Sequence, residues 1–493
     1  MTTGAVAPRE RRLQLPIWVR SITGYLIVPN LAFLILGWFV YMNRPLVNLD
    51  YLLLGAVAGL LPPAIVIVAY VLLVANDAFV TLAPVFHFNL ETAAWSTPYG
   101  LRLGLGAASL GFVLVTSAVT IAVLGIRFSQ GQSRRGVQPS ALALALLIFG
   151  LDFVGGTNRL SHADAALIPF NLATSASYNI VLSLYHAVRG GRSDPKVKRI
   201  EYAQSATGQL RRVLNTSSPA HSIGAQHLVI VIVESLGQLE DSAGAPLILG
   251  PLLSGDVRRR YTINTGTVQT HGATTSGELR ELCGVDTDYR SIAAVDLTSC
   301  IPIQLRSAGF KTVAIHGYSG GFFDRARWYP QIGFEQTRFG DDLARTASVA
   351  VCGSTFRGVR DPDAGRLVAR QLLDAPKGER RFVYWLTLSS HLPVDASCGA
   401  ESGLDCRATA ETTRFADVCA LLRIQYLVAQ SVAEIATDPL LPPTRFIVVG
   451  DHPPPFFSRA RRSLFAEGRV PFVELIPRPA RPSVRRATSS PPR

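Results

Sequence analysis

Long apolar runs crowd the first third of this chain and constrain its fold more than any other feature. Before residue 156 several stretches approach the roughly 20 residues that a helix needs to cross a bilayer. After residue 222 the apolar segments become short and are separated by polar residues, which is typical of an α/β domain. With 493 residues the chain is too long for one ordinary domain. We therefore predict a membrane block followed by a globular domain with its own core.

Five crossings are predicted in the membrane block, with the N-terminus in the cytoplasm and the following domain outside. The apolar stretches expected to cross are Ile22–Met42, Tyr51–Val74 with a kink at Pro62-Pro63, Ala78–Trp95, Leu103–Ile126 and Pro139–Val154. The third is the weakest because it contains His87 and Glu91, and a re-entrant or interfacial segment is its alternative. With it, the arginines before Ile22 and those between Arg127 and Arg135 both lie on the cytoplasmic side, as the positive-inside rule requires.

Composition divides the chain into four parts. We expect a transmembrane domain over 1–156, an interfacial connector over 157–222, a soluble domain over 223–477 and a disordered basic tail over 478–493. Within the connector, Lys196–Leu214 is expected to form an amphipathic helix on anionic headgroups. The net charge of +13 is scattered around the membrane segments, and the soluble domain has no basic patch interleaved with aromatics. We therefore expect anionic lipid, and no nucleic acid, as a partner.

All six cysteines lie in the second half of the chain, and no CxxC pair occurs, so a structural zinc site is not expected. An even set within one soluble domain indicates disulfides formed in an oxidising compartment, and six buried free thiols are the alternative. Proximity in the sequence suggests the pairs Cys283–Cys300 and Cys398–Cys406, although spacing does not determine connectivity. The remaining cysteines are Cys352 and Cys419.

Four apolar segments of the soluble domain are followed by residues that can bind a metal or a phosphate. We expect them to be buried parallel strands, at Gln226–Val233, Lys311–Ile315, Arg381–Leu388 and Arg445–Val449. The polar residues after them are Glu234, His316, His391 and the pair Asp451-His452. Ligands bind at the carboxyl ends of such strands, and Glu with an Asp-His pair suits a divalent cation. For each residue alone, a solvated strand end or a structural histidine is the alternative.

The stretch His271–Glu278 predicts a helix start beside a nucleophile. The segment Thr275-Ser-Gly-Glu278 has the spacing of a capping box, which places Thr274 just before the helix N-terminus. Unpaired N–H groups and the helix dipole would stabilise an alkoxide or a phosphate oxygen there. A capped helix without a catalytic role is the alternative. The loop Tyr318–Arg325 combines glycine, aromatic residues and arginine, which suits an organic group beside a phosphate, or else a flexible loop with one aromatic anchor.

Five motifs in sequence order resemble the alkaline-phosphatase/sulfatase superfamily, and most closely its membrane-anchored lipoteichoic acid synthase-like branch. They are Val231–Ser235, Gly272–Leu279, His316–Arg325, Ser390–Pro393 and Gly450–His452. The resemblance covers about 226–477 and implies a sulfatase-like α/β domain with a mostly parallel central sheet. It also implies about five transmembrane helices and an extracytoplasmic catalytic domain, in agreement with the topology predicted above.

The resemblance implies a role for each matched position. Thr274 would be the nucleophile and also a ligand of a divalent metal, manganese first, with zinc or magnesium as alternatives. The other metal ligands would be Glu234, Asp451 and His452. The residues that would hold the phosphate and its headgroup are His316, Phe323, Arg325 and His391.

Two positions depart from the branch. The family usually carries tryptophan where Phe323 stands and often an acidic residue where Tyr318 stands, so the donor headgroup stays open. The Cys-x-Pro-x-Arg motif of true sulfatases is absent, since Gly-Val-Asp follows Cys283. A formylglycine nucleophile is therefore not expected.

Together these features predict a metal-dependent transferase in the bacterial cytoplasmic membrane. It would move phosphoglycerol or phosphoethanolamine from a membrane phospholipid to a hydroxyl of a glycan or lipid, through a phospho-threonine. A phosphodiesterase or sulfatase-type hydrolase, which uses water at the same site, is the first alternative. A non-catalytic module that binds headgroups is the second, and the complete set of expected ligands argues against it.

Overall fold

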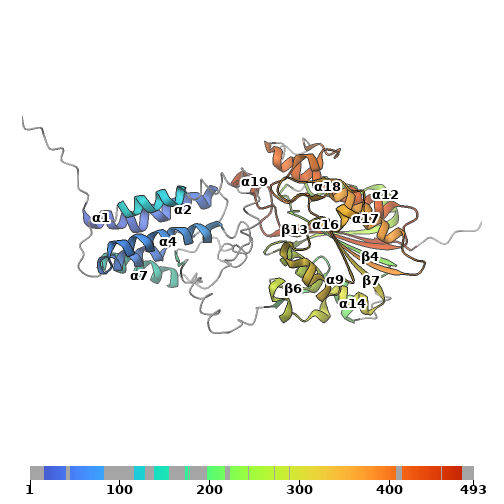
Figure 1. Ribbon diagram of the computed structural model, residues 1–493, viewed down its shortest axis with the longest axis horizontal. Coiled ribbons are helices and arrows are strands. Elements are labelled where there is room, and N and C mark those ends of the chain that lie inside the picture. Colours follow the sequence, from blue (N-terminus) through green and yellow to red (C-terminus); the bar gives the residue numbers. More distant parts are fainter. Residues whose placement is uncertain are drawn as a thin grey trace, which may run out of the picture. The chain divides into compact units, whose positions relative to one another are not determined.

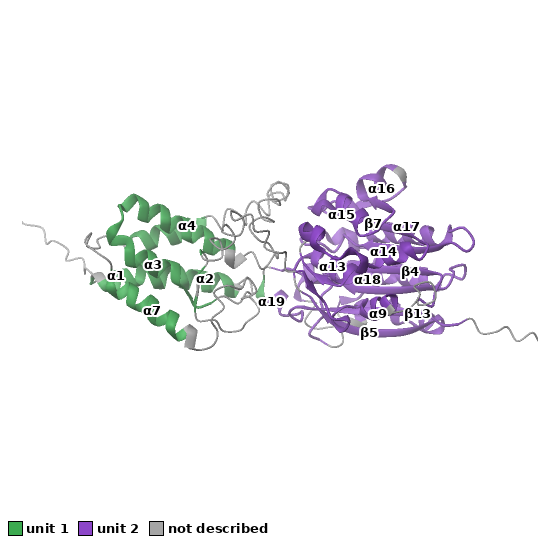
Figure 2. Cartoon of the chain, turned by 90° about the horizontal axis from the view of Figure 1, so that it is seen from below, with its two compact units in different colours: residues 1–192, 457–459 green, residues 193–456, 460–493 purple. Residues whose placement is uncertain are grey.

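The computed structural model contains two compact units, formed by residues 1–192 with 457–459 and by residues 193–456 with 460–493 (Figure 2). The residues that the structure describes are 16–39, 45–82, 116–127, 138–154, 173–175, 177, 197–216, 223–241, 244–270, 272–287, 289–406, 414–456 and 458–479. Each unit has its own buried clusters of apolar side chains. The two units are therefore described separately.

The first unit is helical. Its helices include α1 (Ile17–Ile22), continued by the π-helical η1 (Thr23–Ile27) and α2 (Val28–Phe39), then α3 (Leu49–Val57), η2 (Ala58–Leu60), α4 (Pro63–Leu82) and α7 (Pro139–Val154). Figure 1 labels α1, α2, α4 and α7. Three tyrosines pack between them, and the Tyr70 hydroxyl donates to the Gly24 carbonyl oxygen at 2.7 Å. Gly55 permits this packing, because a Cβ there would lie 2.8 Å from the Tyr25 ring.

Helices cover parts of the predicted crossings. Pro139–Val154 is helical as expected, and Tyr51–Val74 is divided at Leu61-Pro62, where a kink at Pro62-Pro63 was predicted. Proline at 63 starts α4 instead of kinking a longer helix, and α4 runs on into the stretch predicted as the third crossing. Residues 83–115, which include most of the third crossing and half of the fourth, lie outside the described residues.

By length and composition, two described helices could span a bilayer, Trp18–Trp38 and Ala416–Thr437. The second is a core helix of the other unit, since 67% of its most apolar window is buried. Most exposed large apolar side chains of the described residues lie on helices of the first unit, for example Trp18, Leu72 and Leu146. Such a surface suits lipid contact. The count of five crossings stays a prediction.

A seven-stranded sheet forms the centre of the second unit, in the order β5-β13-β12-β4-β11-β7-β8. The parallel strands are β4 (His227–Val233), β7 (Phe310–His316), β8 (Gln336–Phe339), β11 (Arg380–Leu386) and β12 (Thr444–Gly450). β13 (Arg469–Pro477) pairs in antiparallel fashion with β12 and with the edge strand β5 (Tyr261–Gln269). The mostly parallel sheet and the four expected strands are thus confirmed, within two residues at each end.

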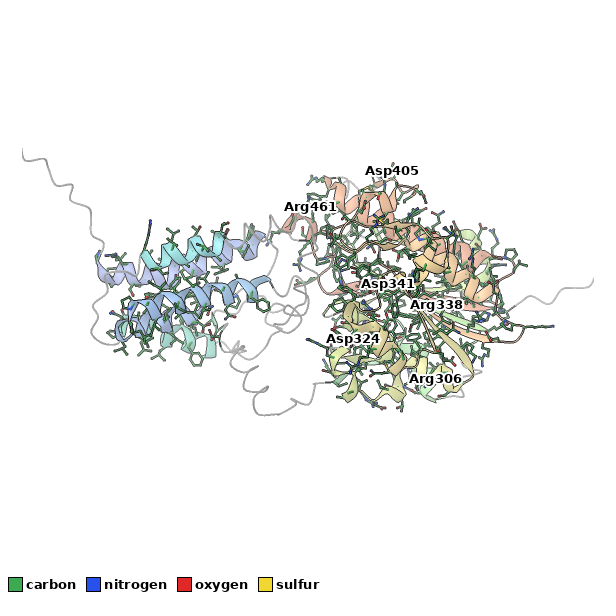
Figure 3. All side chains as sticks on the ribbon, viewed as in Figure 1. Arg306, Asp324, Arg338, Asp341, Asp405 and Arg461 are labelled. Carbon is green, nitrogen blue, oxygen red and sulfur yellow. A yellow bond between two sulfur atoms is a disulfide. The ribbon has the colours of Figure 1, made fainter. Side chains whose placement is uncertain are left out.

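Helices cover both faces of this sheet (Figure 1). α17 (Asp361–Leu373) and α18 (Ala416–Thr437) pack on the face that Val229, Val231 and Val233 form. On the opposite side lie α9 (Gly208–Thr216) and α14 (Ile301–Ser307). Charged side chains such as Arg306, Arg338 and Asp341 are exposed at the surface of the unit (Figure 3). A water-facing surface around an apolar core is what the composition after residue 222 predicts.

The second unit begins before the predicted soluble domain. Within the predicted connector, β3 (Lys198–Arg199) pairs with β6 (Val285–Asp286), and α9 buries Leu210 and Leu214. One continuous amphipathic helix over Lys196–Leu214 is therefore wrong, because its first half is a strand and a turn that pack on the unit. Of residues 157–196 of the predicted connector, the structure describes 173–175 and 177, of which Ala173–Thr174 pairs with Val47–Asn48.

All six cysteines are paired. Cys283–Cys300 is confirmed, but Cys398–Cys406 is wrong, and the observed pairs are Cys352–Cys398 and Cys406–Cys419. Cys398 lies in η10 (Ala396–Gly399) beside β9 (Val351–Cys352), while Cys406 lies beside the first turn of α18. Proximity in sequence failed here because the fold brings each cysteine to a partner on another element.

Candidate active site

The site begins where two central parallel strands end. β4 and β12 are neighbours, with Val233 opposite Gly450, so Glu234 and Asp451 emerge side by side at the carboxyl edge of the sheet. Ser235 follows with a φ of 55°, a left-handed conformation that is uncommon for a residue other than glycine. This turn directs the Ser235 N–H to Asp451 Oδ1, at 2.8 Å. Strained backbone of this kind clusters at functional sites.

Thr274 is the first residue of helix α13 (Thr274–Cys283). The predicted capping box is wrong, because Ala273 is the N-cap residue and no side chain caps the helix. Glu278, expected to reach back to the N-terminus, points into a buried ion pair instead. The N–H groups of the first turn therefore lack a capping side chain next to the Thr274 hydroxyl, which is the arrangement that favours an anion.

Four predicted residues meet at this point. Thr274 Oγ1 lies 3.2 Å from Glu234 Oε2 and 3.3 Å from His452 Nε2. His452 Nε2 in turn lies 3.6 Å from Glu234 Oε1 and 3.3 Å from Asp451 Oδ2. All four side chains are buried. The structure thus brings together the nucleophile and the three metal ligands that the sequence predicts.

The donor set fits a divalent cation. Ligand atoms of Glu234, Asp451 and His452 lie within 4.8 Å of one another, and buried Asp451 Oδ2 has no hydrogen-bond donor. Burial and the charge of Glu234 raise the pKa of Asp451 to about 7. Burial lowers the pKa of His452, but the charges of Asp451 and Glu234 outweigh it and raise that pKa. Two crowded carboxylates with an imidazole and a hydroxyl are oxygen and nitrogen ligands suited to zinc, manganese or magnesium.

Other residues hold this cluster, and sequence reasoning gave them no role. The Ser390 hydroxyl donates to the Glu234 carbonyl oxygen at 2.6 Å, and Thr387 Oγ1 accepts the Glu234 N–H at 2.9 Å. Gln425 Nε2 donates to the Ser235 carbonyl oxygen at 2.8 Å. The sequence contains a signal for Gln425, because this amide interrupts the apolar run of helix α18. The structure shows that it is buried.

Arg325 does not point at Thr274 but at Glu278, one turn further along α13. Its Nη2 and Nε lie 2.9 and 3.1 Å from Glu278 Oε2, and both side chains are buried. The hydroxyls of Tyr329 and Tyr384 also donate to Glu278. Burial lowers the pKa of Arg325, but the opposite effect of the Glu278 carboxylate is larger, and the pKa lies above its usual value. The guanidinium is therefore charged. Direct contact of Arg325 with a phosphate stays a prediction.

The remaining predicted residues border an aromatic cluster. The Phe323 ring packs on Phe322, with centroids 4.3 Å apart, and Phe356 lies 3.8 Å from the His391 ring. Phe323 itself has a φ of 54°. His316 is buried at the end of β7, and burial together with the charge of Arg325 keeps its pKa well below the usual value. Burial lowers the pKa of His391 to about 4. Both histidines are therefore neutral imidazoles, which can accept or donate a hydrogen bond.

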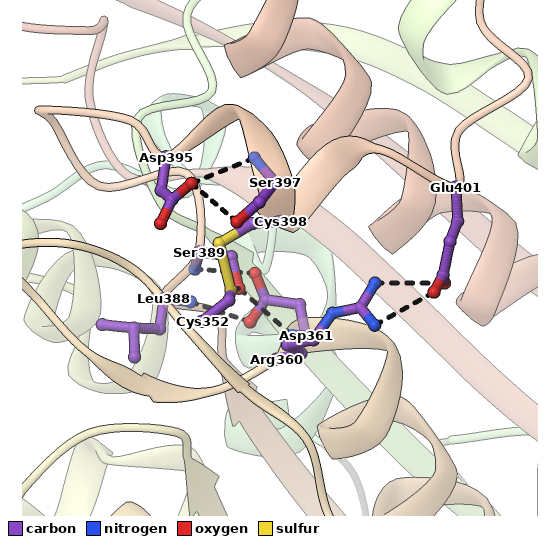
Figure 4. Close-up of a disulfide and its surroundings, with 9 residues drawn as sticks. All are labelled: Cys352, Arg360, Asp361, Leu388, Ser389, Asp395, Ser397, Cys398 and Glu401. Carbon is purple, nitrogen blue, oxygen red and sulfur yellow. Dashed lines mark hydrogen bonds and ion pairs between the residues drawn. A yellow bond between two sulfur atoms is a disulfide. The ribbon is translucent and has the colours of Figure 1, made fainter.

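Asp361 and a disulfide hold the start of the loop that carries His391, at Leu388 and Ser389 (Figure 4). Asp361 accepts the N–H groups of Leu388 and Ser389 at 2.9 and 2.8 Å. The Cys352–Cys398 disulfide lies against Ser389, whose hydroxyl is 3.6 Å from Cys352 Sγ. A buried carboxylate and a covalent link thus hold the loop that carries His391, in addition to the contact of the His391 ring with Phe356.

Several solved structures are similar to this chain. The lipoteichoic acid synthase LtaP from Listeria monocytogenes is 15% identical with a TM-score of 0.39, and the match covers 52% of this chain and 67% of that one. The phosphoglycerol transferase GacH of Streptococcus pyogenes, in complex with sn-glycerol-1-phosphate, is 13% identical with a TM-score of 0.36, covering 57% and 78%. The C-terminal periplasmic domain of EptC from Escherichia coli, in complex with zinc, is 12% identical with a TM-score of 0.36, covering 51% and 73%.

A search of curated protein sequences found no significant match. The comparison with protein families was decisive, because the sulfatase family model matches residues 226–488, more than half of the chain. This span runs from Gln226, the first residue of the first predicted strand, past the last strand of the sheet, and it contains every predicted site residue. The chain therefore belongs to the sulfatase family.

Proposed function

We propose that this protein is a membrane-anchored, metal-dependent phosphotransferase of the lipoteichoic acid synthase-like branch of its superfamily. It moves a phosphoglycerol or phosphoethanolamine headgroup from a membrane phospholipid to a hydroxyl of a glycan or lipid. The observation that carries the proposal is the position of Thr274 Oγ1, within 3.3 Å of both Glu234 and His452 at the start of a ten-residue helix.

Glu234, Asp451 and His452 would hold the cation, and Thr274 would complete the set. A bound divalent cation, manganese first among the candidates, would lower the pKa of the Thr274 hydroxyl and polarise a phosphoryl oxygen of the donor. The uncapped first turn of α13 offers its N–H groups to the same phosphate. Burial of the four side chains excludes water, which strengthens each of these interactions.

The reaction proceeds in two displacements. Thr274 Oγ1 forms a bond to the headgroup phosphorus, and the bond from phosphorus to the diacylglycerol oxygen breaks. The proton of the threonine hydroxyl has an acceptor in Glu234 Oε2, and the departing diacylglycerol gains one proton overall. In the second step the acceptor hydroxyl displaces Thr274 and returns a proton to it. Neutral His316 and His391 would bind phosphate oxygens or the headgroup.

The aromatic side chains near His391 bear on the identity of the donor. Tyr318, Phe322 and Phe356 pack against one another with ring centroids 5.3 to 5.8 Å apart. Phe323 and Tyr318 stand where the branch usually has tryptophan and often an acid. The carbon part of a headgroup can pack on such rings. The residue at position 318 is a tyrosine and offers no carboxylate that would select for an amine.

The three disulfides support a location outside the cytoplasm, since such bonds persist in oxidising compartments. The exposed apolar helices of the first unit support an anchor in the cytoplasmic membrane of a bacterium. A multi-pass anchor keeps the site near its lipid donor, which raises the effective donor concentration.

Intact-mass spectrometry tests the proposal. The purified full chain is incubated with Mn²⁺ and vesicles of phosphatidylglycerol and phosphatidylethanolamine. We expect a mass gain of one phosphoglycerol or phosphoethanolamine group on the peptide that contains Thr274, which also names the donor. The Thr274→Ala variant should bind Mn²⁺, gain no mass and lose turnover by more than about 10³-fold.

Each other outcome would indicate a different function or mechanism for this protein. Free phosphorylated headgroup without transfer to an added glycan or lipid acceptor would establish a hydrolase. An adduct on a residue other than Thr274 would refute the assigned nucleophile. Headgroup binding without adduct or turnover would identify a non-catalytic module.

A further inference from the structure

A buried ion pair on α13 contacts the backbone of two predicted metal ligands through its arginine. Arg280 and Glu281 follow Thr274 by almost two helical turns, and their side chains are 3% and 0% exposed. They form an ion pair, with Arg280 Nε 2.8 Å from Glu281 Oε1. Buried charges of this kind are costly unless each is fully paired, so their contacts indicate what the pair is for.

The other N–H groups of Arg280 donate hydrogen bonds at the carboxyl end of β12. Its Nη2 donates to the Gly450 carbonyl oxygen at 3.0 Å, and its Nη1 lies 3.3 Å from the Asp451 carbonyl oxygen. The Thr270 hydroxyl donates to the same Asp451 oxygen at 2.6 Å. One guanidinium thus connects the helix that begins with Thr274 to the two peptide groups that position Asp451 and His452.

Glu281 fixes the orientation of that guanidinium. Its Oε2 accepts the Ser205 hydroxyl at 2.8 Å and the Thr207 N–H at 2.9 Å, and the Thr207 hydroxyl donates to the Glu281 carbonyl oxygen at 2.6 Å. Burial raises the pKa of Glu281, but the opposite effect of Arg280 and these hydrogen bonds is larger, and the pKa lies below its usual value. The carboxylate is therefore charged. Both partners of the pair are therefore held in place before any ligand binds.

Close packing makes the connection rigid. A Cβ on Gly277 would lie 3.1 Å from both Cα and Cβ of Asp451, which is tighter than nearly all real contacts. Glycine at this position lets α13 approach Asp451 at the distance from which Arg280 reaches its carbonyl oxygen. The nucleophile helix and the ligand strand therefore move as one body.

We propose that Arg280, oriented by Glu281, Ser205 and Thr207, is a positioning residue that sets the distance between Thr274 and the ligand pair Asp451-His452. The inference rests on the proposed metal site and goes beyond it, because neither residue touches substrate or metal. Outer residues that orient metal ligands typically contribute 10- to 100-fold in affinity or rate. Ser205 and Thr207 also attach the first segment of the second unit to the metal site.

The test compares two buried ion pairs at opposite ends of β12. Arg280→Leu/Glu281→Leu removes both charges together, so no uncompensated charge remains buried. The matched control is Arg445→Leu/Glu474→Leu, which removes another buried pair, near the amino end of the same strand. Arg280→Lys keeps the charge but not the planar fork, and serves as the conservative variant.

Two quantities are measured on each full-length variant in detergent: the dissociation constant for Mn²⁺ by titration calorimetry of metal-free protein, and kcat with phospholipid vesicles. We expect Arg280→Leu/Glu281→Leu to weaken Mn²⁺ binding and to lower kcat by about 10- to 100-fold each. The control pair should change neither by more than about twofold, and Arg280→Lys should fall between the two.

Three results would overturn the inference. The first is a double variant that binds Mn²⁺ and turns over like the wild type, which would remove the positioning role but leave the metal site intact. The second is an equal loss in the control pair, which would show that general stability is responsible. The third is a wild-type chain that binds no divalent cation, which would refute the proposed function and this inference together.

Discussion

Glu278 illustrates how single residues of this site depend on paired charges. Its carboxylate receives Arg325 on one oxygen and the hydroxyls of Tyr329 and Tyr384 on the other. None of these groups is exposed to solvent. A buried carboxylate with this many donors is compensated, and the group that loses most on its removal is Arg325.

We predict that Glu278→Gln lowers the free energy of unfolding by about 3–5 kcal/mol, because it leaves a buried arginine without its counter-charge. Urea denaturation measures this loss. Tyr384→Phe is the control, since it removes one hydrogen bond and should cost about 1 kcal/mol. A loss for Glu278→Gln no larger than that of the control would show that Arg325 finds another partner.

Thr274 and the three predicted metal ligands were predictable, and the residues that hold them in place were not. Each of the four lies beside a recognisable strand or helix start, and the resemblance to the superfamily implied a role for each. The residues that hold them were missed because hydrogen bonds such as Gln425 to Ser235 and Arg280 to Gly450 join positions far apart in the chain. The burial of Arg325 was missed because its partner is on another helix.

At the scale of elements, the contact between α13 and the end of β12 leaves almost no room for a larger side chain. We predict that Gly277→Ala lowers kcat about tenfold or more, because the added methyl group pushes the nucleophile away from the ligand strand by a few tenths of an ångström. Steady-state kinetics with vesicle substrate measures the effect.

Gly250→Ala is the matched control, since a Cβ there meets no atom within 4 Å. It should leave kcat unchanged. Equal activity of the Gly277→Ala variant and the wild type would mean that α13 can shift without moving Thr274.

The disulfides stabilise elements that lie apart in sequence. Removing Cys352–Cys398 by double serine substitution should cost about 4 kcal/mol, and removing Cys406–Cys419 about 3 kcal/mol, because the closed loops span 46 and 13 residues. Guanidinium denaturation of the two variants measures the difference. The reverse order would indicate that strain or residual structure, rather than loop entropy, dominates.

Elements with a strong pattern were predicted well. β4 and β12 are buried along their whole length, and such apolar runs identify central strands. The antiparallel strands β5 and β13 were not foreseen, because β5 mixes threonine, asparagine and glycine and β13 contains Pro471 and Pro477. The break before Pro63 was predicted as a kink, since apolar composition alone does not separate one long helix from two.

At the scale of the whole molecule, the metal should contribute to stability as well as to chemistry. We predict that a chelator lowers the melting temperature of the second unit by about 5–10 °C, since a cation at 100 times its dissociation constant contributes about 2.7 kcal/mol. Scanning calorimetry measures this shift, and readdition of Mn²⁺ should reverse it. An unchanged melting temperature would argue against the metal site.

The two units should also be separable. We predict that a chain starting at Ser193 folds, binds Mn²⁺ as the full chain does, and loses at least about tenfold in turnover of vesicle phospholipid, because the site is no longer held near the bilayer. A soluble phosphodiester of the headgroup is the control substrate and should be turned over equally by both forms. Equal rates on vesicles would show that the first unit has no role in presenting the donor.

The strand order has a consequence for how the protein is made. Glu234 and Asp451 directly follow adjacent strands, although 216 positions of chain separate Ser235, which follows Glu234, from Asp451. A ribosome must therefore complete β12 before Asp451 and His452 can lie beside Glu234. We predict that the proposed metal site forms only at this late stage of synthesis, so that a chain released before β12 binds no divalent cation at these residues.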